Sequence, residues 1–296
     1  MPAVLLATCA QLPAGDDDAD LLVSALTERG VDARWVIWTD PDVDWTAGLV
    51  VLRATWDYTF DLPAFLDWVH AVPRVANEAA VVAWNTDKVY LRDLEAAGIP
   101  IVPTTFVAPT ETTVLFGGGA AGPGAGELVV KPSVGAGSRG AGRFSADQAD
   151  AARTHLQRLQ AAGRTALVQP YLEAVDEAGE TALIYVDGRL SHAIRKGPLL
   201  PPGTARAVDA GALYAEERIE AKTPLAAELA IGAAVMDFVR DRFGADQLYA
   251  RVDLLPSPAG PLVVELELAE PSLFLQDGIG DHEPVDAFAT AIAERA

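Results

Sequence analysis

The chain has 296 residues and a formal net charge of −20, with 50% hydrophobic and 22% charged residues. This length predicts about two domains on the soft prior of roughly 150 residues each, and it allows a core large enough for an enzyme. The acidic balance excludes nucleic acid and anionic membranes as partners, because both require clustered Lys and Arg side chains. No run approaches the roughly 18 apolar residues of a membrane helix, and the N-terminus lacks the basic region of a signal peptide. Cys9 is the single cysteine, so no internal disulfide can form. We therefore expect a reducing, cytoplasmic setting.

A first α/β unit is predicted for residues 1–82. Apolar runs predict strands at residues 3–9, 33–38 and 49–54, and helical spacing predicts helices at residues 19–29 and 62–71. We expect Asp16–Asp18 to cap the first helix and Gly30 to end it. Strands that alternate with helices predict a parallel sheet with crossover helices, and we interpret this unit as a substrate domain.

Two further units are predicted, over residues 83–165 and 166–296. In the second unit we expect a helix at 87–97, a glycine-rich loop at 117–126, a strand at 128–131, a second glycine-rich loop at 135–142 and a helix at 146–162. In the third we expect a strand at 166–172, a hairpin of 181–186 with 190–195, a helix at 225–243, a hairpin of 248–255 with 262–269 and a helix at 286–295.

The run Gly135-Ala-Gly137-Ser-Arg-Gly140 matches the G-x-G-x-x-G pattern of dinucleotide-binding turns and follows a predicted strand. A dinucleotide site requires a helix that begins at the last glycine, whereas the residues after Gly140 have an extended pattern, which disfavours a nicotinamide oxidoreductase. No G-x-x-x-x-G-K-[ST] run occurs, so a P-loop is excluded. We expect a flap whose backbone N–H groups, with Ser133, Ser138 and Arg139, close over a triphosphate; the alternative is a solvent-exposed hairpin tip.

Charged side chains alternate along the last predicted hairpin. Arg251 and Asp253 share one face of their strand, as do Glu265 and Glu267 on theirs, and pairing of 253 with 265 brings all four together. Two carboxylates about 4 Å apart repel by roughly 4 kcal/mol at an effective dielectric constant near 20, so this cluster in a cleft needs a cation. Oxygen ligands that leave room for phosphate oxygens suit Mg²⁺, and the alternative is a solvated acidic face.

The chain has four lysines, Lys88, Lys131, Lys196 and Lys222. Lys88 and Lys131 each lie beside a turn that can face a cleft, although an ordinary surface position is the alternative for both. The strand that ends in Gln169-Pro-Tyr-Leu172 offers backbone donors and acceptors along an apolar edge. This pattern suits adenine, and a plain strand end is the alternative.

These pieces, in this order, resemble the ATP-grasp superfamily over residues 82–275, and most closely its glutathione-synthetase-like branch. The superfamily order is a Lys, a second Lys before a glycine-rich loop, a Gln or Glu hinge, and Asp followed later by Glu-x-Asn; here Glu267 stands in place of the Asn. The resemblance implies an α/β and α+β fold with a Rossmann-like N-terminal domain, a central lid domain and a C-terminal antiparallel-sheet domain. It also implies an ATP-dependent ligase that activates a carboxylate as an acyl phosphate and forms a C–N bond.

The resemblance assigns a role to each matching residue. Lys88 and Lys131 hold the ATP phosphates beside Ser138 of the flap; Gln169, Tyr171 and Leu172 hold adenine; Glu180 binds the ribose; Asp253, Glu265 and Glu267 hold two Mg²⁺ ions; and Arg251, with Lys131, stabilises the acyl phosphate. The departure at Glu267 still allows metal binding, but it adds a negative charge.

The run Arg53-Ala-Thr-Trp-Asp-Tyr58 follows a predicted strand, at the edge where α/β folds bind ligands. We expect a small amino-acid-like substrate to be held by Arg53, Thr55, Trp56, Asp57, Tyr58, Arg195, Lys196 and Ser272, with core packing as the alternative for the two aromatic residues. This run and residues 265–274 resemble the ATP-grasp cyclo-ligases that close O-ureido-D-serine to D-cycloserine. An intermolecular amino-acid or peptide ligase and an ATP-binding regulator without turnover remain the alternatives, and the sequence leaves a homo-oligomer open.

Overall fold

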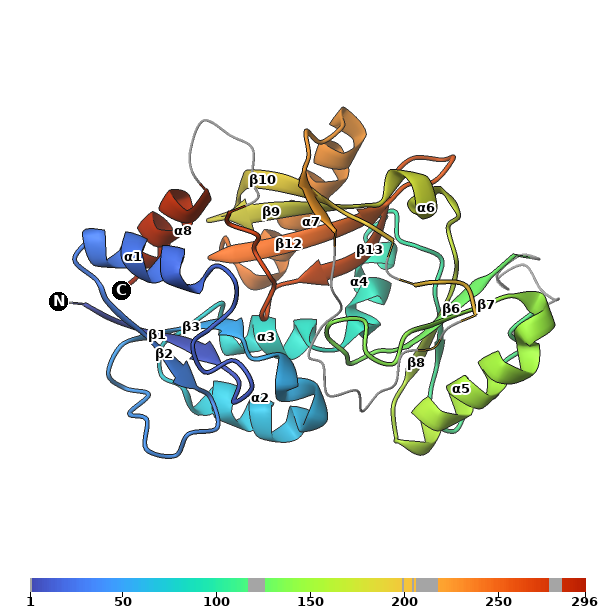
Figure 1. The fold of residues 1–296 in the computed structure, drawn as a ribbon, viewed down its shortest axis with the longest axis horizontal. Helices are drawn as coiled ribbons and strands as arrows, with labels where there is room; N and C mark the ends of the chain where they lie inside the picture. The colour runs from blue at the N-terminus through green and yellow to red at the C-terminus, as the bar shows by residue number, and fades with distance from the viewer. Residues whose placement is uncertain (1, 117–125, 199, 204, 206–217, 277–283) are drawn as a thin grey trace.

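The structure is a computed structural model, and it describes residues 2–116, 126–198, 200–203, 205, 218–276 and 284–296. The predicted glycine-rich loop at 117–126 lies outside these residues except for Gly126. The described strands form three sheets, which Figure 1 shows arranged along the long axis of the molecule. Among the described helices, none has both the length and the apolar character that crossing a membrane requires.

The N-terminal unit is a parallel sheet covered on both faces, as the alternating strands and helices predicted. Its strands run in the order β2-β1-β3-β4. The elements are β1 (Ala3–Thr8), α1 (Ala19–Glu28), β2 (Asp32–Ile37), β3 (Leu49–Ala54), η1 (Trp56–Phe60), α2 (Leu62–Ala71) and β4 (Val75–Ala76). Every residue of β3 is buried, as expected for a parallel strand between two layers of helices. Figure 1 shows α1 beside the last helix, α8 (Pro284–Ala293), with α2 on the other face of the sheet.

The predicted caps of α1 are only half correct. Gly30 follows the helix with a φ of 73°, in the left-handed conformation that ends helices. The Asp18 side chain, however, makes no capping hydrogen bond; its oxygens accept from the backbone N–H of Leu275 at 3.1 and 3.2 Å. Asp16 instead forms an ion pair with Arg53 at 2.7 Å. These acids therefore join distant segments and do not stabilise the helix end.

The middle unit is an antiparallel sheet in the order β5-β8-β6-β7, with helix α5 packed on it. The elements are β5 (Thr105–Val107), β6 (Leu128–Pro132), β7 (Gly142–Phe144), η3 (Ala146–Gln148), α5 (Ala149–Ala161) and β8 (Ala166–Pro170). Since β8 pairs with both β5 and β6, a domain boundary at residue 165 would divide this sheet. The strand at 166–172, which we expected in the third unit, therefore belongs with the lid.

The C-terminal unit is a five-stranded sheet in the order β11-β10-β9-β12-β13. The elements are α6 (Ala174–Ala178), β9 (Glu180–Val186), β10 (Arg189–Lys196), β11 (Ile219–Ala221), α7 (Ala226–Phe243), β12 (Tyr249–Leu255) and β13 (Leu262–Glu267). Both predicted hairpins are present. The β9–β10 turn has Asp187 and Gly188 at φ of 51° and 70°, the positive values that a tight two-residue hairpin requires.

The helix that we expected at 87–97 is divided into η2 (Lys88–Tyr90) and α4 (Leu91–Ala96) and packs on this C-terminal sheet. It is preceded by α3 (Ala79–Asn85), a helix that we did not predict. Leu91 and Leu94 share a core cluster with Leu254 and Val263. The Asn85 side chain donates to the carbonyl of Leu266 at 2.8 Å, which fixes α3 against β13. The lid is thus the middle sheet with α5, and Lys88 is carried by the C-terminal core.

Candidate active site

A cavity of about 340 Å³ lies where the three units meet, within the roughly 300–1,000 Å³ of small-molecule sites. Its walls come from β12 and β13, from β6 and the glycine-rich loop after it, from the segment after β8, and from the loops after β1 and β3. Apolar side chains such as Val102, Val129 and Leu172 line one part of it, and carboxylates and cations line another. The cavity can therefore hold a molecule with an apolar ring and a highly charged group.

The strand register brings the predicted acids together. Arg251 pairs with Glu267 and Asp253 with Glu265, as the hairpin pattern predicted. One carboxylate oxygen from each of Asp253, Glu265 and Glu267 lies within 4.8 Å of the others. Oxygen-only ligands at this spacing suit Mg²⁺. Burial and the neighbouring acids raise the pKa of Glu267 to about 7, against the effect of Arg251, which indicates that the cluster lacks positive charge.

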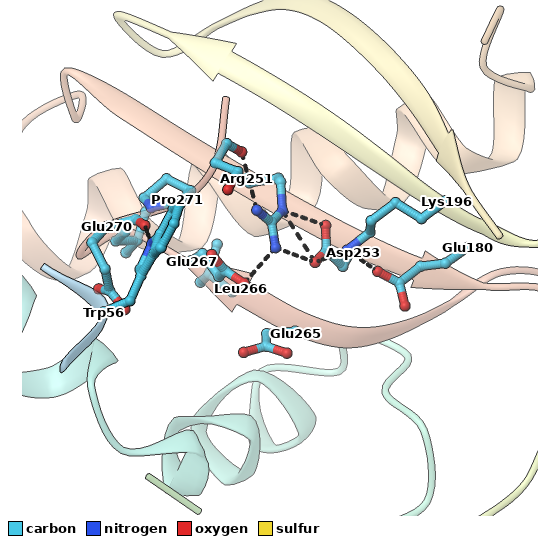
Figure 2. A network of polar contacts seen from close by, with 12 residues as sticks. Trp56, Glu180, Lys196, Arg251, Asp253, Glu265, Leu266, Glu267, Glu270 and Pro271 are labelled. Atoms are coloured by element: carbon cyan, nitrogen blue, oxygen red, sulfur yellow. Dashed lines mark hydrogen bonds and ion pairs between the residues drawn. The ribbon is translucent and has the colours of Figure 1, made fainter. Parts of the chain in front are cut away.

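Arg251 and Lys196 hold the cluster in place (Figure 2). The Arg251 guanidinium donates to Asp253 at 2.9 Å, contacts Glu267, and donates to the Ser272 carbonyl at 3.0 Å. Lys196 lies 2.8 Å from Asp253 and also contacts Glu180. Burial opposes the charged form of Asp253, but the two cations prevail and hold the pKa of its carboxyl well below its usual range. Asp253 is therefore ionised at neutral pH.

The two lysines that we expected at the phosphates meet Glu265 from the other side. Lys88 lies 2.9 Å from Glu265 and donates to the Gly135 carbonyl at 2.6 Å, so it links the β13 acid to the glycine-rich loop. Lys131 lines the cavity next to them. Burial lowers the pKa of Lys131, the charge of Lys88 lowers it further, and Glu265 opposes both. Two cations close to each other are well placed to bind an anion.

The glycine-rich loop ends in a strand and not in a helix. It connects β6 to the antiparallel strand β7, which excludes the dinucleotide-binding turn. Ser138, predicted in the flap, lines the cavity with a φ of 59°. Arg139 ties the loop to η1, because its guanidinium donates to the Trp56 carbonyl and the Thr59 hydroxyl at 2.6 Å each. The loop thus joins the lid to the N-terminal unit.

The segment after β8 forms the apolar end of the cavity. Gln169, Tyr171 and Leu172 all line it, as does Glu180 at the start of β9. The Gln169 amide donates to the Thr104 hydroxyl at 2.9 Å. The Arg143 guanidinium stacks 3.5 Å from the Tyr171 ring centroid, and the Tyr171 hydroxyl donates to Asp176 at 2.5 Å. These two contacts hold the Tyr171 ring in place at this end of the cavity.

The predicted substrate residues divide into two groups. Trp56, Tyr58, Lys196 and Ser272 line the cavity, whereas the structure places Arg53, Thr55, Asp57 and Arg195 outside its lining.

Three of the excluded residues have partners elsewhere, and Thr55 has a buried hydroxyl without a hydrogen-bond partner among the described residues. Arg53 is fully buried and paired with Asp16, and Asp57 accepts from the Trp38 indole at 2.7 Å. Arg195 points to the opposite face of β10 from Lys196, since neighbouring residues of a strand alternate, and it donates to backbone carbonyls of α6. Thr55 is fully buried.

Several cavity residues were missed from the sequence. They are Asp16, Asp17, Asp18, Asn85, Glu270, Phe274 and Gln276. The loop of Asp16–Asp18 follows the carboxyl end of β1, where open α/β sheets bind ligands, so its position alone could have indicated it. Glu270 lies three residues after Glu267, in the run that resembles the cyclo-ligases, and was passed over for Ser272.

Comparison with known proteins identifies the relatives of the chain. A family model described as the N-terminal domain of D-cycloserine synthetase DcsG matches residues 4–77. The cycloserine biosynthesis protein DcsG of Streptomyces lavendulae is 38% identical over 291 residues, which cover 95% of this chain and 94% of that protein. The crystal structure of D-cycloserine synthetase DcsG superposes with a TM-score of 0.86 at 35% identity, covering 99% of both chains.

More distant structures share the fold. The D-alanine–D-alanine ligase of Bacillus anthracis, complexed with ATP, superposes with a TM-score of 0.62 at 13% identity over 99% of this chain and 97% of that chain. A RimK domain ATP-grasp protein of Sphaerobacter thermophilus gives 0.62 at 17% identity over 98% of both. These similarities confirm the predicted ATP-grasp fold of the α/β and α+β class. The chain therefore belongs to the D-cycloserine synthetase DcsG family, and it is an ATP-dependent ligase of the ATP-grasp type.

Proposed function

We propose that the protein closes O-ureido-D-serine to D-cycloserine, using ATP and Mg²⁺ to activate the substrate carboxylate as an acyl phosphate. The DcsG relatives support D-cycloserine as the product by their names and by their near-complete coverage of the chain. The observation that carries the chemistry is the meeting of Asp253, Glu265 and Glu267 with Lys88 and Lys131 in one cavity. An acidic triad opposite cations is the arrangement that phosphoryl transfer needs.

The residues present fit ATP and two Mg²⁺ ions. Asp253, Glu265 and Glu267 would hold the metal, and the raised pKa of Glu267 supports a cation at this position. A metal held by these carboxylates would supply positive charge that offsets the charge of the phosphates during transfer. Adenine would lie against Gln169, Tyr171 and Leu172, beside Glu180 for the ribose.

Lys196 takes a different role in this proposal from the one predicted. It lies between Asp253 and Glu180, away from Trp56 in the network of Figure 2. We assign it to the phosphates together with Lys88 and Lys131. The substrate then occupies the end formed by Trp56, Tyr58 and Ser272.

The proposed reaction has three steps, which are phosphorylation of the substrate, ring closure and removal of the carbamoyl group. The substrate carboxylate takes the γ-phosphoryl group, and ADP leaves; Arg251 and Lys131 offset the negative charge of the acyl phosphate. The ureido nitrogen that is bonded to oxygen then attacks the acyl carbon, loses its proton, and releases phosphate as the ring closes. Water removes the carbamoyl group as CO₂ and ammonia. Until ring closure, the glycine-rich loop fastened by Arg139 excludes water from the acyl phosphate.

A coupled assay of ADP formation tests the proposal. O-ureido-D-serine should give ADP and D-cycloserine in equal amounts, and its L-enantiomer is the matched control. A dipeptide product from D-alanine or D-serine would instead establish an intermolecular ligase. ATP binding without ADP formation on any amino acid would indicate a regulator.

A further inference from the structure

The carboxylates at the nucleotide end of the cavity each contact a cation of the chain. Asp253 lies within 2.9 Å of both Arg251 and Lys196, and Glu265 lies 2.9 Å from Lys88. Glu267 contacts the same Arg251, and Glu180 contacts Lys196. Pairing of this kind is what allows charged groups to be buried.

Glu270 is the exception. It is only 7% exposed and lines the same cavity, yet among the described residues no Lys or Arg forms an ion pair with it. Its carboxyl interacts with the Tyr58 hydroxyl, a neutral donor, and its backbone carbonyl accepts from the Trp56 indole at 2.9 Å. Figure 2 shows Glu270 and Trp56 at the opposite end of the network from Lys196 and Glu180.

Burying a charged carboxylate without a paired cation costs free energy. The site around Glu270, as the described residues form it, therefore lacks a paired positive charge that a ligand could supply. Burial and the charge of Glu267 raise the pKa of Glu270 to about 8, and the charge of Lys88, which forms no ion pair with Glu270, opposes them without prevailing. The other acids near the substrate end differ from Glu270 because the buried ones lie close to a cation, although burial still raises the pKa of Asp18 to about 6. Asp16 and Asp18 lie 2.7 and 3.8 Å from Arg53, and Asp17 is exposed.

We propose that Glu270 binds the α-ammonium group of the amino-acid substrate. This role rests on the proposed function, because the carboxylate to be phosphorylated must lie beside the acidic triad. In an α-amino acid the ammonium nitrogen is two bonds from the carboxyl carbon, and Glu270 follows Glu267 by three residues. Tyr58 would orient the carboxyl, and the ammonium would supply the charge that the chain does not. The ion pair between Glu270 and the substrate ammonium thereby favours binding of amino acids over simple carboxylic acids.

Calorimetry on the full chain, with Mg²⁺ and a non-hydrolysable ATP analogue present, tests this role. The two probes are O-ureido-D-serine and 3-(ureidooxy)propanoate, which lacks only the amino group. The wild-type protein should bind the amino compound roughly 10- to 100-fold more tightly, as expected for one charge-assisted hydrogen bond. Glu270→Gln should bring this ratio close to one, whereas Tyr58→Phe should lower it only in part.

The matched control is Glu95→Gln, an exposed acid on α4 that should leave the ratio unchanged. Unchanged affinity for the ATP analogue shows that Glu270→Gln is folded. If Glu270→Gln keeps the wild-type ratio of affinities for the two probes, the proposed role of Glu270 is wrong. It is also wrong if the wild type binds both probes equally. In either case the proposed substrate stands. A lower kcat with the full ratio would place Glu270 in the chemical step instead. A wild type that does not bind O-ureido-D-serine overturns the proposed function, and this role with it.

Discussion

The carboxylates at the β12–β13 end of the cavity are paired with cations, whereas Glu270 at the other end has no such partner among the described residues. At the β12–β13 end, Asp253 is 2% exposed and shares its charge with Arg251 and Lys196. At the end beside η1, Glu270 is nearly as buried; its carboxyl interacts with the Tyr58 hydroxyl and, within the described part of the chain, forms no ion pair, with the charge of Lys88 acting only at longer range. At the first end, each of the clustered acids already contacts a cation of the chain before any ligand binds. The second depends on the ligand for its positive charge, which makes that ligand's amino group a condition for tight binding.

The largest effect is expected at the β12–β13 end. Asp253→Asn should lower the rate of D-cycloserine formation on the order of 10³-fold, comparable to losing one strong electrostatic contact in a transition state. It should also lower the free energy of unfolding by about 3 kcal/mol, because two buried cations lose a partner. Product assays and urea unfolding measure both. Asp241→Asn, at an exposed position of α7, is the control, and an unchanged rate would remove Asp253 from the metal site.

Lys131→Ala should weaken ATP binding by roughly 10- to 100-fold, since a charge-assisted hydrogen bond contributes about 1.5–3 kcal/mol. Calorimetry with Mg²⁺ and an ATP analogue measures the change. Lys222→Ala is the control, because that ammonium pairs with Glu228 at 2.7 Å outside the cavity lining. It should lower stability and leave ATP affinity as it is. Equal ATP affinity in wild type and Lys131→Ala would contradict the phosphate site.

Arg139→Ala tests the contact between the lid and the substrate end. The side chain holds Trp56 and Thr59 and lies 4.6 Å from the Phe60 ring centroid. Its loss should raise the KM for substrate roughly tenfold, the equivalent of about one such hydrogen bond. More ADP than product should form, because water then reaches the acyl phosphate. Arg139→Lys should have a KM between those of the wild type and Arg139→Ala. If Arg139→Ala forms ADP and product in a one-to-one ratio, the loop closes without the Arg139 side chain.

The smallest effect concerns pH. His155 on α5 lies 2.8 Å from the Gly140 carbonyl, and burial lowers its pKa below the usual 6.5. The unfolded chain therefore binds a proton first, so stability is complete above pH 6.5 and falls as the pH is lowered through the folded pKa. His155→Gln should make unfolding less dependent on pH below about 6.5. The exposed His70→Gln should retain the wild-type slope, and a slope shared by both variants would contradict the assignment.

Short-range patterns correctly predicted how the charged side chains of the last hairpin come together. The two-residue alternation on β12 and β13 placed Arg251, Asp253, Glu265 and Glu267 on one face, and the strand register agrees. The substrate end was predicted less well. Arg53 and Asp57 carry charges that could bind an amino acid. In the structure, however, Arg53 forms an ion pair with Asp16, and Asp57 accepts a hydrogen bond from the Trp38 indole. The domain boundary at 165 was misplaced because β8 looked like the start of a new unit, and its partner β6 lies more than 30 residues earlier.

By itself, the sequence determined the family, the order of the motifs and the face of each strand that carries charge, because these depend on spacing along one segment. The tertiary structure alone decided which acids receive a cation and which do not. Arg53 lies 37 residues from Asp16, and Tyr58 lies far along the chain from Glu270. Packing between units brings such groups together. The charge left unpaired at Glu270 is therefore a property of the fold and not of any motif.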